Sequence, residues 1–348
     1  MLDNLPRLPK NTISVHQVQL ILQGARLRGV DILALLEKAG ISPDLMNQPR
    51  ARVTQTQYSR LVIMMTRQLR DELWGLCSLP LPPGSFASCC RLLAHAPNLG
   101  EALRLGLRYF HPLLSDFTPR LRVQDGIAFC ELQDHVQPTD AQRYAKRVFL
   151  FFSYGLACWL IEKRIPLLAV HYRQDDSQMQ TEAMRLFQAP VVYVNGNMGY
   201  RFSAQWLDTP VLQLTSSVES YLRRAPSSML LTYRDQTSYT ERVKRLVRKD
   251  LSDPLLSFEQ IARTLNTTPQ TLRRKLMKEG QGFQDIKNEM RRDVAIELLT
   301  DTDVKMSEIA NRLGFSELAT FHRAFREWTG VTPGNFRSGI QKIGNDAQ

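Results

Sequence analysis

The sequence predicts two domains of different class, an α+β domain followed by an all-α domain. Strand-like alternation occurs only before residue 223. A segment that mixes Pro, Ser, Thr and charged residues spans 223–238, as is typical of a domain boundary, and only helical periodicity follows Tyr239. We therefore expect an α+β domain at 13–232, a linker at 233–239 and an all-α domain at 240–338.

The composition is that of a packed protein. Hydrophobic residues make up 43% and charged residues 23% of the 348 residues, which excludes wholesale disorder and a fibrous repeat. The most apolar stretch, Val148–Ile161, is shorter than the roughly 20 residues of a membrane-spanning helix, so we interpret it as a buried core helix. The N-terminal residues MLDNLPRLPKNTIS contain prolines and no apolar run of signal-peptide length. We expect a cytoplasmic protein without membrane contact.

Residues 13–115 are predicted to be mostly helical, and strands follow. Apolar spacing indicates helices in VHQVQLILQGARLRG, DILALLEKAGI, TQYSRLVIMMTRQL and GEALRLGLRYFHPLL. The runs RLRV and IAFCEL, joined at Gln124-Asp125-Gly126, predict a β-hairpin, and LLAVHY and VVYV predict further strands. The spacing of LQLTSSVESYL indicates either a dimer seam or a helix that packs onto its own domain.

No residue pattern predicts catalysis, a metal site or a cofactor. The chain lacks the GxSxG, GxxxxGK[ST], GxGxxG and HExxH motifs, and its six histidines have no metal-ligand spacing. The five cysteines have no CxxC spacing and are interpreted as core thiols, with oxidant sensing by Cys89-Cys90 as the alternative. We therefore predict that the protein is not an enzyme.

The all-α domain contains an internal repeat, which indicates that one helical pair has been used twice. The first helix of the pair recurs after 48 residues and the second after 49. The extra residue lies in the turn between the helices, where a change in length is tolerated. Ile261-Ala262 and Leu265 recur as Ile309-Ala310 and Leu313, and Leu272, Arg274 and Leu276 recur as Phe321, Arg323 and Phe325.

The first copy has the signals of a helix-turn-helix at about 257–279. Ser257 and Gln260 form a capping-box pattern that starts a helix near residue 258. Asn266 tolerates the left-handed turn that ends this helix. Thr268-Pro269 then supplies an N-cap and the first residue of a second helix, which we expect to end at about Glu279.

The second copy predicts a helix-turn-helix at about 306–329. Gly314 ends its first helix, and Ser316 is expected to cap the next one. That second helix is expected to run from Glu317 to about Thr329 and to stop at Gly330.

A helix-turn-helix presents the N-terminal half of its second helix to the major groove of DNA, where Arg reads guanine and Gln reads adenine. The i, i+4 pairs Leu272/Leu276 and Phe321/Phe325 are expected to face the core, which turns neighbouring polar residues outward. The predicted base-reading residues are Gln270, Arg273, Arg274, Glu317, Thr320 and Arg323, and the predicted phosphate contacts are Thr268, Lys275, Lys278, Lys287, Ser316, His322 and Arg337.

The net charge of +11 favours a polyanionic partner such as nucleic acid. The charge per residue is similar in both predicted domains, so charge alone does not locate the site. A solvated helix face is the alternative interpretation of the exposed basic residues.

Two strings of the all-α domain, GFSELATFHRAFREWTGVTPGNFR and TTPQTLRRKLMKEGQGFQDIKNEMRRDVAIELL, carry a resemblance to a known family. The first resembles the C-terminal signature of the AraC/XylS family of transcriptional regulators, and the second resembles its first recognition helix and its linking helix. The resemblance covers residues 240–338. The sequence departs from the family at Asn266, where glycine is usual, and at Glu317-Leu318-Ala319, a poor start for DNA contact. The resemblance implies that Gln270, Arg273 and Arg274 occupy base-facing positions of the first unit, and Glu317, Thr320 and Arg323 the matching face of the second.

Residues 13–232 resemble the N-terminal effector-binding and dimerisation domain of the family branch described as arabinose-binding-like. GVDILALLEKAGI, LGEALRLGLRYF and FSAQWLDTPV carry this match. The resemblance implies a small-molecule effector and a homodimer. The sequence identifies no effector-binding residue: Tyr109, Phe110, His111, Trp159 and His171 are candidates by type, but such residues more often belong to a core.

These patterns together predict a sequence-specific DNA-binding transcriptional regulator that acts as an effector-responsive activator. Its two helix-turn-helix units are expected to enter adjacent major grooves, on an asymmetric site of about 20 base pairs. The resemblance implies promoter sites arranged as direct repeats and contact with RNA polymerase. A ligand-independent regulator, a repressor and an architectural DNA-binding protein remain alternatives.

Overall fold

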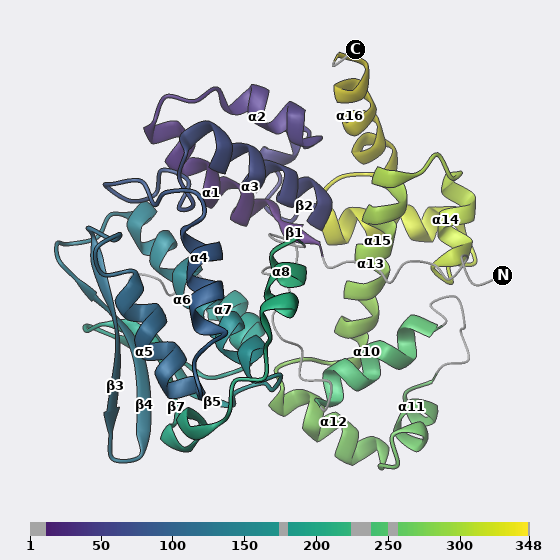
Figure 1. The fold of residues 1–348 in the computed structure, drawn as a ribbon. Helices are drawn as coiled ribbons and strands as arrows, with labels where there is room; N and C mark the ends of the chain where they lie inside the picture. The colour runs from purple at the N-terminus through teal and green to yellow at the C-terminus, as the bar shows by residue number, and fades with distance from the viewer. Residues whose placement is uncertain (1–11, 174–179, 224–237, 250–256, 347–348) are drawn as a thin grey trace. The chain divides into compact units, whose positions relative to one another are not determined.

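The computed structural model describes residues 12–173, 180–223, 238–249 and 257–346. The chain divides into two compact units that do not follow the order of the sequence (Figure 1). The first unit comprises Met1–Gln19, Ile32–Leu61 and Gln236–Gln348, and the second comprises Leu20–Asp31 and Val62–Asp235.

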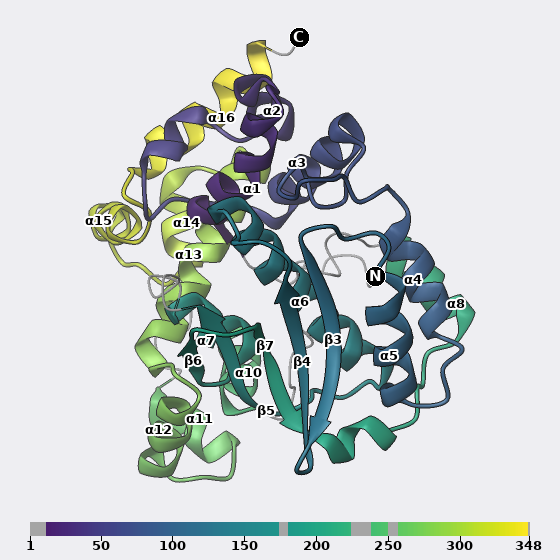
Figure 2. The same cartoon turned by 90° about the vertical axis from the view of Figure 1, so that its left-hand side faces the viewer.

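The second unit contains a five-stranded sheet with the strand order β3-β4-β7-β5-β6 (Figure 2). Strands β5 and β6 pair in parallel, and the other neighbours pair antiparallel. Strand β7 is last in the sequence but lies between β4 and β5, a position that its sequence did not predict. The strands are β3 Phe117–Gln124, β4 Ile127–Asp134, β5 Leu167–Arg173, β6 Val191–Val194 and β7 Met198–Ser203.

The predicted hairpin joins β3 and β4. Gln124 pairs with Ile127, which leaves a two-residue loop. Both loop residues have positive φ, 50° at Asp125 and 72° at Gly126. Such a loop matches the right-handed twist of the two strands, because Asp and Gly tolerate the left-handed conformation. The hairpin prediction is confirmed.

Helix α6, Asp140–Leu160, contains most of the apolar stretch and is a buried core helix, as predicted. The Thr139 hydroxyl accepts a hydrogen bond from the Gln142 backbone N at 3.3 Å, and Gln142 Oε1 accepts one from the Thr139 N at 2.9 Å. The fully buried Tyr154 donates its hydroxyl proton to the Ile165 carbonyl at 2.8 Å. No helix among the described residues is both long and apolar enough to span a membrane.

The four helices predicted before residue 115 are present. Two more helices of the second unit, α4 and α7, were not predicted. The helices are α1 Val15–Leu27, α2 Ile32–Ala39, α3 Gln55–Leu69, α4 Ser85–Leu93, α5 Leu99–Tyr109 and α7 Gln180–Phe187, with short 3₁₀ helices η1 Pro43–Asn47 and η3 Ala204–Asp208.

Helix α8, Thr215–Arg223, packs onto its own unit. Val218 is fully buried, and the ring of Tyr221 stacks on Trp159 with centroids 4.4 Å apart. On the exposed side, Arg91 Nε donates to Glu219 Oε1 at 2.7 Å. Of the two interpretations of this segment, the structure therefore supports packing within its own domain.

All five cysteines are free and buried. Burial raises the pKa of the Cys89 thiol to about 12 and raises the pKa of Cys90 as well. Because thiolates are the reactive form, these thiols are inert near neutral pH. The interpretation as core thiols is confirmed, and the structure gives no support to an oxidant sensor at Cys89-Cys90.

Every described element of the first unit beyond residue 238 is a helix, as predicted. The predicted linker at 233–239 lies outside the described residues except for its last two positions. The helices are α10 Tyr239–Lys249, α11 Phe258–Thr264, α12 Pro269–Lys278, α13 Phe283–Asp301, α14 Met306–Arg312, α15 Leu318–Thr329 and α16 Pro333–Asp346.

A short N-terminal ribbon also belongs to the first unit. Strand β1, Ile13–Ser14, pairs antiparallel with β2, Arg52–Val53. The hydroxyl of Thr12 donates to Asp293 Oδ1 of α13 at 2.6 Å, and Arg52 Nε donates to the same hydroxyl at 2.6 Å. No sequence pattern predicts this contact, because Thr12 and Asp293 are 281 residues apart.

Candidate nucleic-acid interface

The first helix-turn-helix, α11 and α12, is held by the local signals that the sequence predicted. The Ser257 hydroxyl accepts a bond from the Gln260 N at 3.2 Å, and Gln260 Oε1 accepts one from the Ser257 N at 2.9 Å. Asn266 adopts a φ of 51° between the helices. The Thr268 hydroxyl caps α12 by accepting a bond from the Thr271 N at 3.1 Å. Both capping predictions are confirmed.

The core of this helix-turn-helix is aliphatic. Leu272 and Leu276 of α12 are 0% and 1% exposed, which confirms that they face inward. They pack in one cluster with α10, α11 and the first half of α13. The residues between these two leucines therefore turn away from the core, because α-helical positions three to four apart share a face. The cluster comprises Val243, Val247, Ile261, Ala262, Leu265, Leu272, Leu276, Ile286 and Met290.

The outward face of α12 carries the three predicted base-reading residues. Gln270, Arg273 and Arg274 are exposed. Gln270 and Arg274 have no hydrogen-bond or ion-pair partner among the described residues. The Arg273 guanidinium lies 5.6 Å from the centre of the Phe258 ring, a geometry that orients the side chain across α11. The face presents one amide and two guanidinium groups to solvent.

The predicted phosphate contacts of the first unit differ in whether their side chains already have partners within the protein. Lys278 is exposed, and no described residue pairs with it. Lys275 is half-buried, donates to the Tyr239 hydroxyl at 2.5 Å and lies 4.0 Å from the centre of that ring. This ammonium group lowers the pKa of Tyr239. The Lys287 ammonium lies 5.7 Å from the Phe283 ring, and the Thr268 hydroxyl is occupied by its cap.

The second helix-turn-helix, α14 and α15, has the same layout with an aromatic core. Phe321 and Phe325 are fully buried, as predicted, and their ring centroids lie 5.9 Å apart. Gly314 in the turn has a φ of 72°, and Gly330 ends α15 with a φ of 82°. The inward and outward faces of the repeat therefore match in the two copies.

The prediction that Ser316 caps the second recognition helix is wrong. The N-cap is Glu317, with an extended backbone at φ −132°, and no side chain caps the helix. Ser316 lies one residue too early for its hydroxyl to reach the N–H groups of the first turn, which an N-cap side chain bonds two to three residues ahead. Its hydroxyl is left exposed and without a partner among the described residues.

The other predicted contacts of the second unit lie at the start of α15, within α15 and on α16. Glu317 and Arg323 are exposed, and Thr320 is half-buried. His322 Nε2 is shielded from solvent without a hydrogen-bond partner, as are Nε and Nη2 of Arg337. His322 and Arg337 therefore reach a phosphate only if their side chains turn outward, whereas Arg323 is already available.

Helix α13 connects the two helix-turn-helix units. Ile286 and Met290 in its first half pack in the core of the first unit. Ala295, Ile296 and Leu299 in its second half are also buried, and α13 contacts α15 and α16. Its 19 residues span about 28 Å at 1.5 Å per residue. The two helix-turn-helix units are thus joined by one continuous α-helix, α13.

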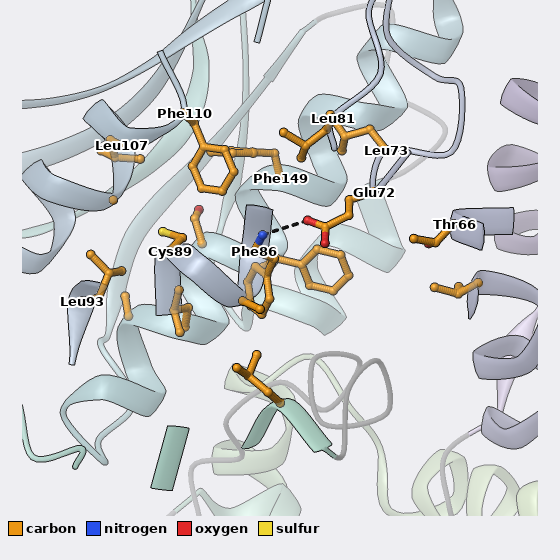
Figure 3. Close-up of a pocket in the computed structure, with 18 of the residues that line it drawn as sticks. Thr66, Glu72, Leu73, Leu81, Phe86, Cys89, Leu93, Leu107, Phe110 and Phe149 are labelled. Carbon is orange, nitrogen blue, oxygen red and sulfur yellow. Dashed lines mark hydrogen bonds between the residues drawn. The ribbon is translucent and has the colours of Figure 1, made fainter. Parts of the chain in front are cut away.

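The second compact unit contains a cavity of about 370 Å³ that is partly open to solvent (Figure 3). Of the pocket candidates named by residue type, Phe110 lines this cavity, and the other four do not. No sequence signal identified the rest of the lining, which comes from α3, α4, α5, α6, α8 and the segment before α4. Such a wall consists of ordinary amphipathic helices, so no motif marks it. No cluster of His, Cys, Asp and Glu suited to a metal ion occurs among the described residues.

Comparison with known proteins agrees with this organisation. The family described as the arabinose-binding domain of AraC transcription regulators, N-terminal, matches residues 29–211, and a helix-turn-helix domain family matches residues 261–339. The chain is 25% identical over 313 residues to the ornithine utilization regulator of Pseudomonas aeruginosa, across 89% of this chain and 91% of that protein.

Two further matches are to proteins of the same organism. The chain is 28% identical over 153 residues to the transcriptional regulator VqsM, across 44% of this chain and 47% of that protein. The crystal structure of the transcriptional regulator CdpR matches over 92% of this chain and 98% of that one, with 19% identity and a TM-score of 0.29. With both family matches in sequence order and a paired helix-turn-helix in the structure, the chain belongs to the AraC family of transcriptional regulators and carries a helix-turn-helix DNA-binding domain.

Proposed function

We propose that this regulator is an effector-responsive activator whose two helix-turn-helix units read adjacent major grooves of promoter DNA. One observation carries the proposal: two outward recognition faces are joined by the single helix α13, whose halves are buried in the two units. The length of α13, about 28 Å, is close to the rise of one turn of duplex DNA, roughly 34 Å. This match supports simultaneous entry into successive grooves on one side of the duplex.

The contacts divide into base readers and phosphate contacts. Arg274 and Gln270 are assigned to base edges, because they are exposed without a described partner, and Arg and Gln make bidentate contacts with guanine and adenine. Arg273, Glu317, Thr320 and Arg323 complete the proposed base-reading set. Lys278 is the best-placed phosphate contact of the first unit, whereas Lys275 must first leave Tyr239.

Regulation is assigned to the α+β domain. Its cavity supports binding of a small molecule, and an effector shifts the regulator only if it binds two states of the protein unequally. Membership in the AraC family supports a homodimer on direct repeats and activation through RNA polymerase. The domain boundaries at 13–232, 233–239 and 240–338 are part of the same proposal.

The test is selection of bound sequences from random duplex DNA by the full-length protein, followed by footprinting at fixed salt. We expect an asymmetric motif of about 20 base pairs, protected over two successive major grooves. Protection of one groove only would contradict the paired reading. Salt-sensitive binding without an enriched motif would make the protein architectural instead.

A matched pair of variants makes the selection sharper. Arg274→Ala is expected to lose enrichment at one base position, because it removes a base reader. Arg263→Ala is the control, since Arg263 is exposed on α11 rather than on the recognition helix, and it should select the wild-type motif. Repeating the selection with and without cell extract filtered to small molecules tests whether an effector is required.

A further inference from the structure

The cavity of the second unit is lined almost entirely by aliphatic and aromatic side chains. They come from α3, α4, α5, α6, α8 and the segment before α4, and the aromatic members are Trp74, Phe86, Phe110, Phe149 and Phe152. An apolar wall stabilises an apolar ligand by removing its surface from water, and a few polar groups then fix the orientation of the ligand. The polar groups of this wall therefore indicate what else the ligand carries.

Most of these polar groups already have partners inside the protein. The Thr66 hydroxyl accepts a bond from Trp74 Nε1 at 3.0 Å. The Ser153 hydroxyl donates to the Leu150 carbonyl at 3.0 Å. Arg67 is exposed to solvent, so its charge is hydrated and adds little selectivity to the interior. Glu72 is the remaining charged group of the wall.

The Glu72 carboxylate retains capacity to accept further hydrogen bonds. Its Oε1 accepts from the Gly84 N at 2.6 Å and its Oε2 accepts from the Phe86 N at 2.8 Å. Figure 3 shows this carboxylate among the apolar side chains of the wall, with its bond to Phe86. An ionised carboxylate offers about four acceptor sites, so about two remain free. No Lys, Arg or His among the described residues forms an ion pair with it.

Glu72 has a second carboxylate, that of Asp71, as its neighbour in the chain. Burial raises the pKa of Glu72, the bonds from Phe86 and Gly84 oppose that rise, and the charge of Asp71 adds to it. Asp71 is 1% exposed, and within the described part of the chain its carboxylate accepts bonds only from the backbone N–H groups of Leu73, Gly75 and Leu81. Glu72 itself is half-buried. A partly buried carboxylate without a cation carries a desolvation cost, which a bound cation offsets.

We propose that this cavity binds a small molecule with a mainly apolar body and one cationic nitrogen group, which donates to the Glu72 carboxylate. The inference rests on the proposed function, since it gives a chemical class to the effector of that regulator. Leu222 at the end of α8 also lines the cavity. The ligand therefore contacts the last described element that precedes the DNA-binding helices in the chain.

The test compares three probes with the same straight alkyl chain, decylamine, decan-1-ol and decanoate, by calorimetric titration of the full-length protein at neutral pH. An alkylammonium is charged there, as a Lys side chain is with a pKa of about 10.4. Because charge-assisted bonds are about twice as strong as neutral ones, we expect decylamine to bind about tenfold tighter than decan-1-ol. Decanoate should bind weakest, since it places like charges together.

Three variants locate the effect. Glu72→Gln should reduce the ratio of amine to alcohol affinity to about one. This ratio is informative even if the lost bonds to Gly84 and Phe86 weaken the fold, because both probes need the same cavity. Arg67→Gln is the matched control and should leave the ratio unchanged. Ala157→Leu, which fills the cavity from α6, should weaken all three probes.

The proposal is overturned if decanoate binds tightest, if Glu72→Gln keeps the wild-type ratio, or if none of the probes binds. DNA selection without any probe reports on the proposed function separately. Retained sequence selection with no probe binding would reject only the ligand class. Probe binding with no sequence selection would reject only the proposed DNA reading.

Discussion

The two helix-turn-helix units share one layout but are stabilised in different ways. In the first unit, side chains cap both helices: Ser257 and Gln260 at α11, and Thr268 at α12. In the second unit, neither Lys305 at α14 nor Glu317 at α15 forms a side-chain cap. A repeat can therefore keep its shape while losing the local polar signals that define its helix starts.

Aromatic packing compensates in the second unit. Phe325 lies between Phe321 and Phe336, at centroid distances of 5.9 and 5.7 Å. The buried Thr329 hydroxyl donates to the Phe325 carbonyl at 2.8 Å near the end of the helix. The aligned positions of the first unit are the aliphatic Leu272 and Leu276. The first unit therefore combines side-chain caps with an aliphatic core, whereas the second unit has an aromatic core and no side-chain cap at α14 or α15.

The largest effect is expected from Phe325→Ala. Removing this buried ring should cost about 3–5 kcal/mol of unfolding free energy, since it leaves a cavity in the core. Urea unfolding by circular dichroism, with hydrogen exchange in α14 and α15 to locate the loss, measures it. Leu318→Ala is the control, because Leu318 is 42% exposed on the same helix. Equal losses in both variants would show that aromatic packing does not stabilise the second unit.

The next effect concerns DNA binding by the two faces. Arg274→Ala should cost about 1–3 kcal/mol of binding free energy and relax preference at one base position, whereas Lys278→Ala should weaken all sequences alike and lower the salt slope by about one. Arg323→Ala, at the aligned position, should relax a second position one DNA turn away. Titrations of a selected site and of single-base variants at several salt concentrations measure both. Uniform weakening by Arg323→Ala would limit the second unit to phosphates.

A smaller effect on the unfolding free energy is expected from variants at the N-termini of the helices in the two units. Ser257→Ala removes the capping box and should cost about 0.5–2 kcal/mol of unfolding free energy. Ser316→Ala should change stability by less than about 0.5 kcal/mol, because Ser316 caps nothing. Urea midpoints of the two variants at one protein concentration provide the comparison. A larger loss at Ser316 would mean that the second unit also depends on a polar cap.

The smallest effect is expected in the turns. Asn266 and Gly314 occupy the same left-handed position, at φ 51° and 72°. Asn266→Gly should change the unfolding free energy by less than about 1 kcal/mol, because relief of the side-chain strain and the greater freedom of the unfolded chain oppose each other. Gly314→Ala should cost more, since alanine is strained there. Thermal melts of both variants test this order.

Much of the candidate interface followed from the sequence because its causes are local. A capping box, a proline at the first helical position and an i, i+4 apolar pair each act within one or two turns. They identified Ser257, Thr268 and Leu272 correctly. Ser316 was assigned wrongly, because the helix starts one residue later than its sequence signals indicated and this shift removes the cap.

The sequence by itself determined the two domain classes, the hairpin, the helical repeat and the outward face of each recognition helix. Only the tertiary structure decided which residues meet across long separations. Examples are the insertion of β7 between β4 and β5, the bond between Thr12 and Asp293, the turn of Lys275 toward Tyr239, and the cavity around Glu72. The physical reason is range: caps and periodicity act between near neighbours, whereas burial and strand pairing depend on residues that only the folded chain brings together.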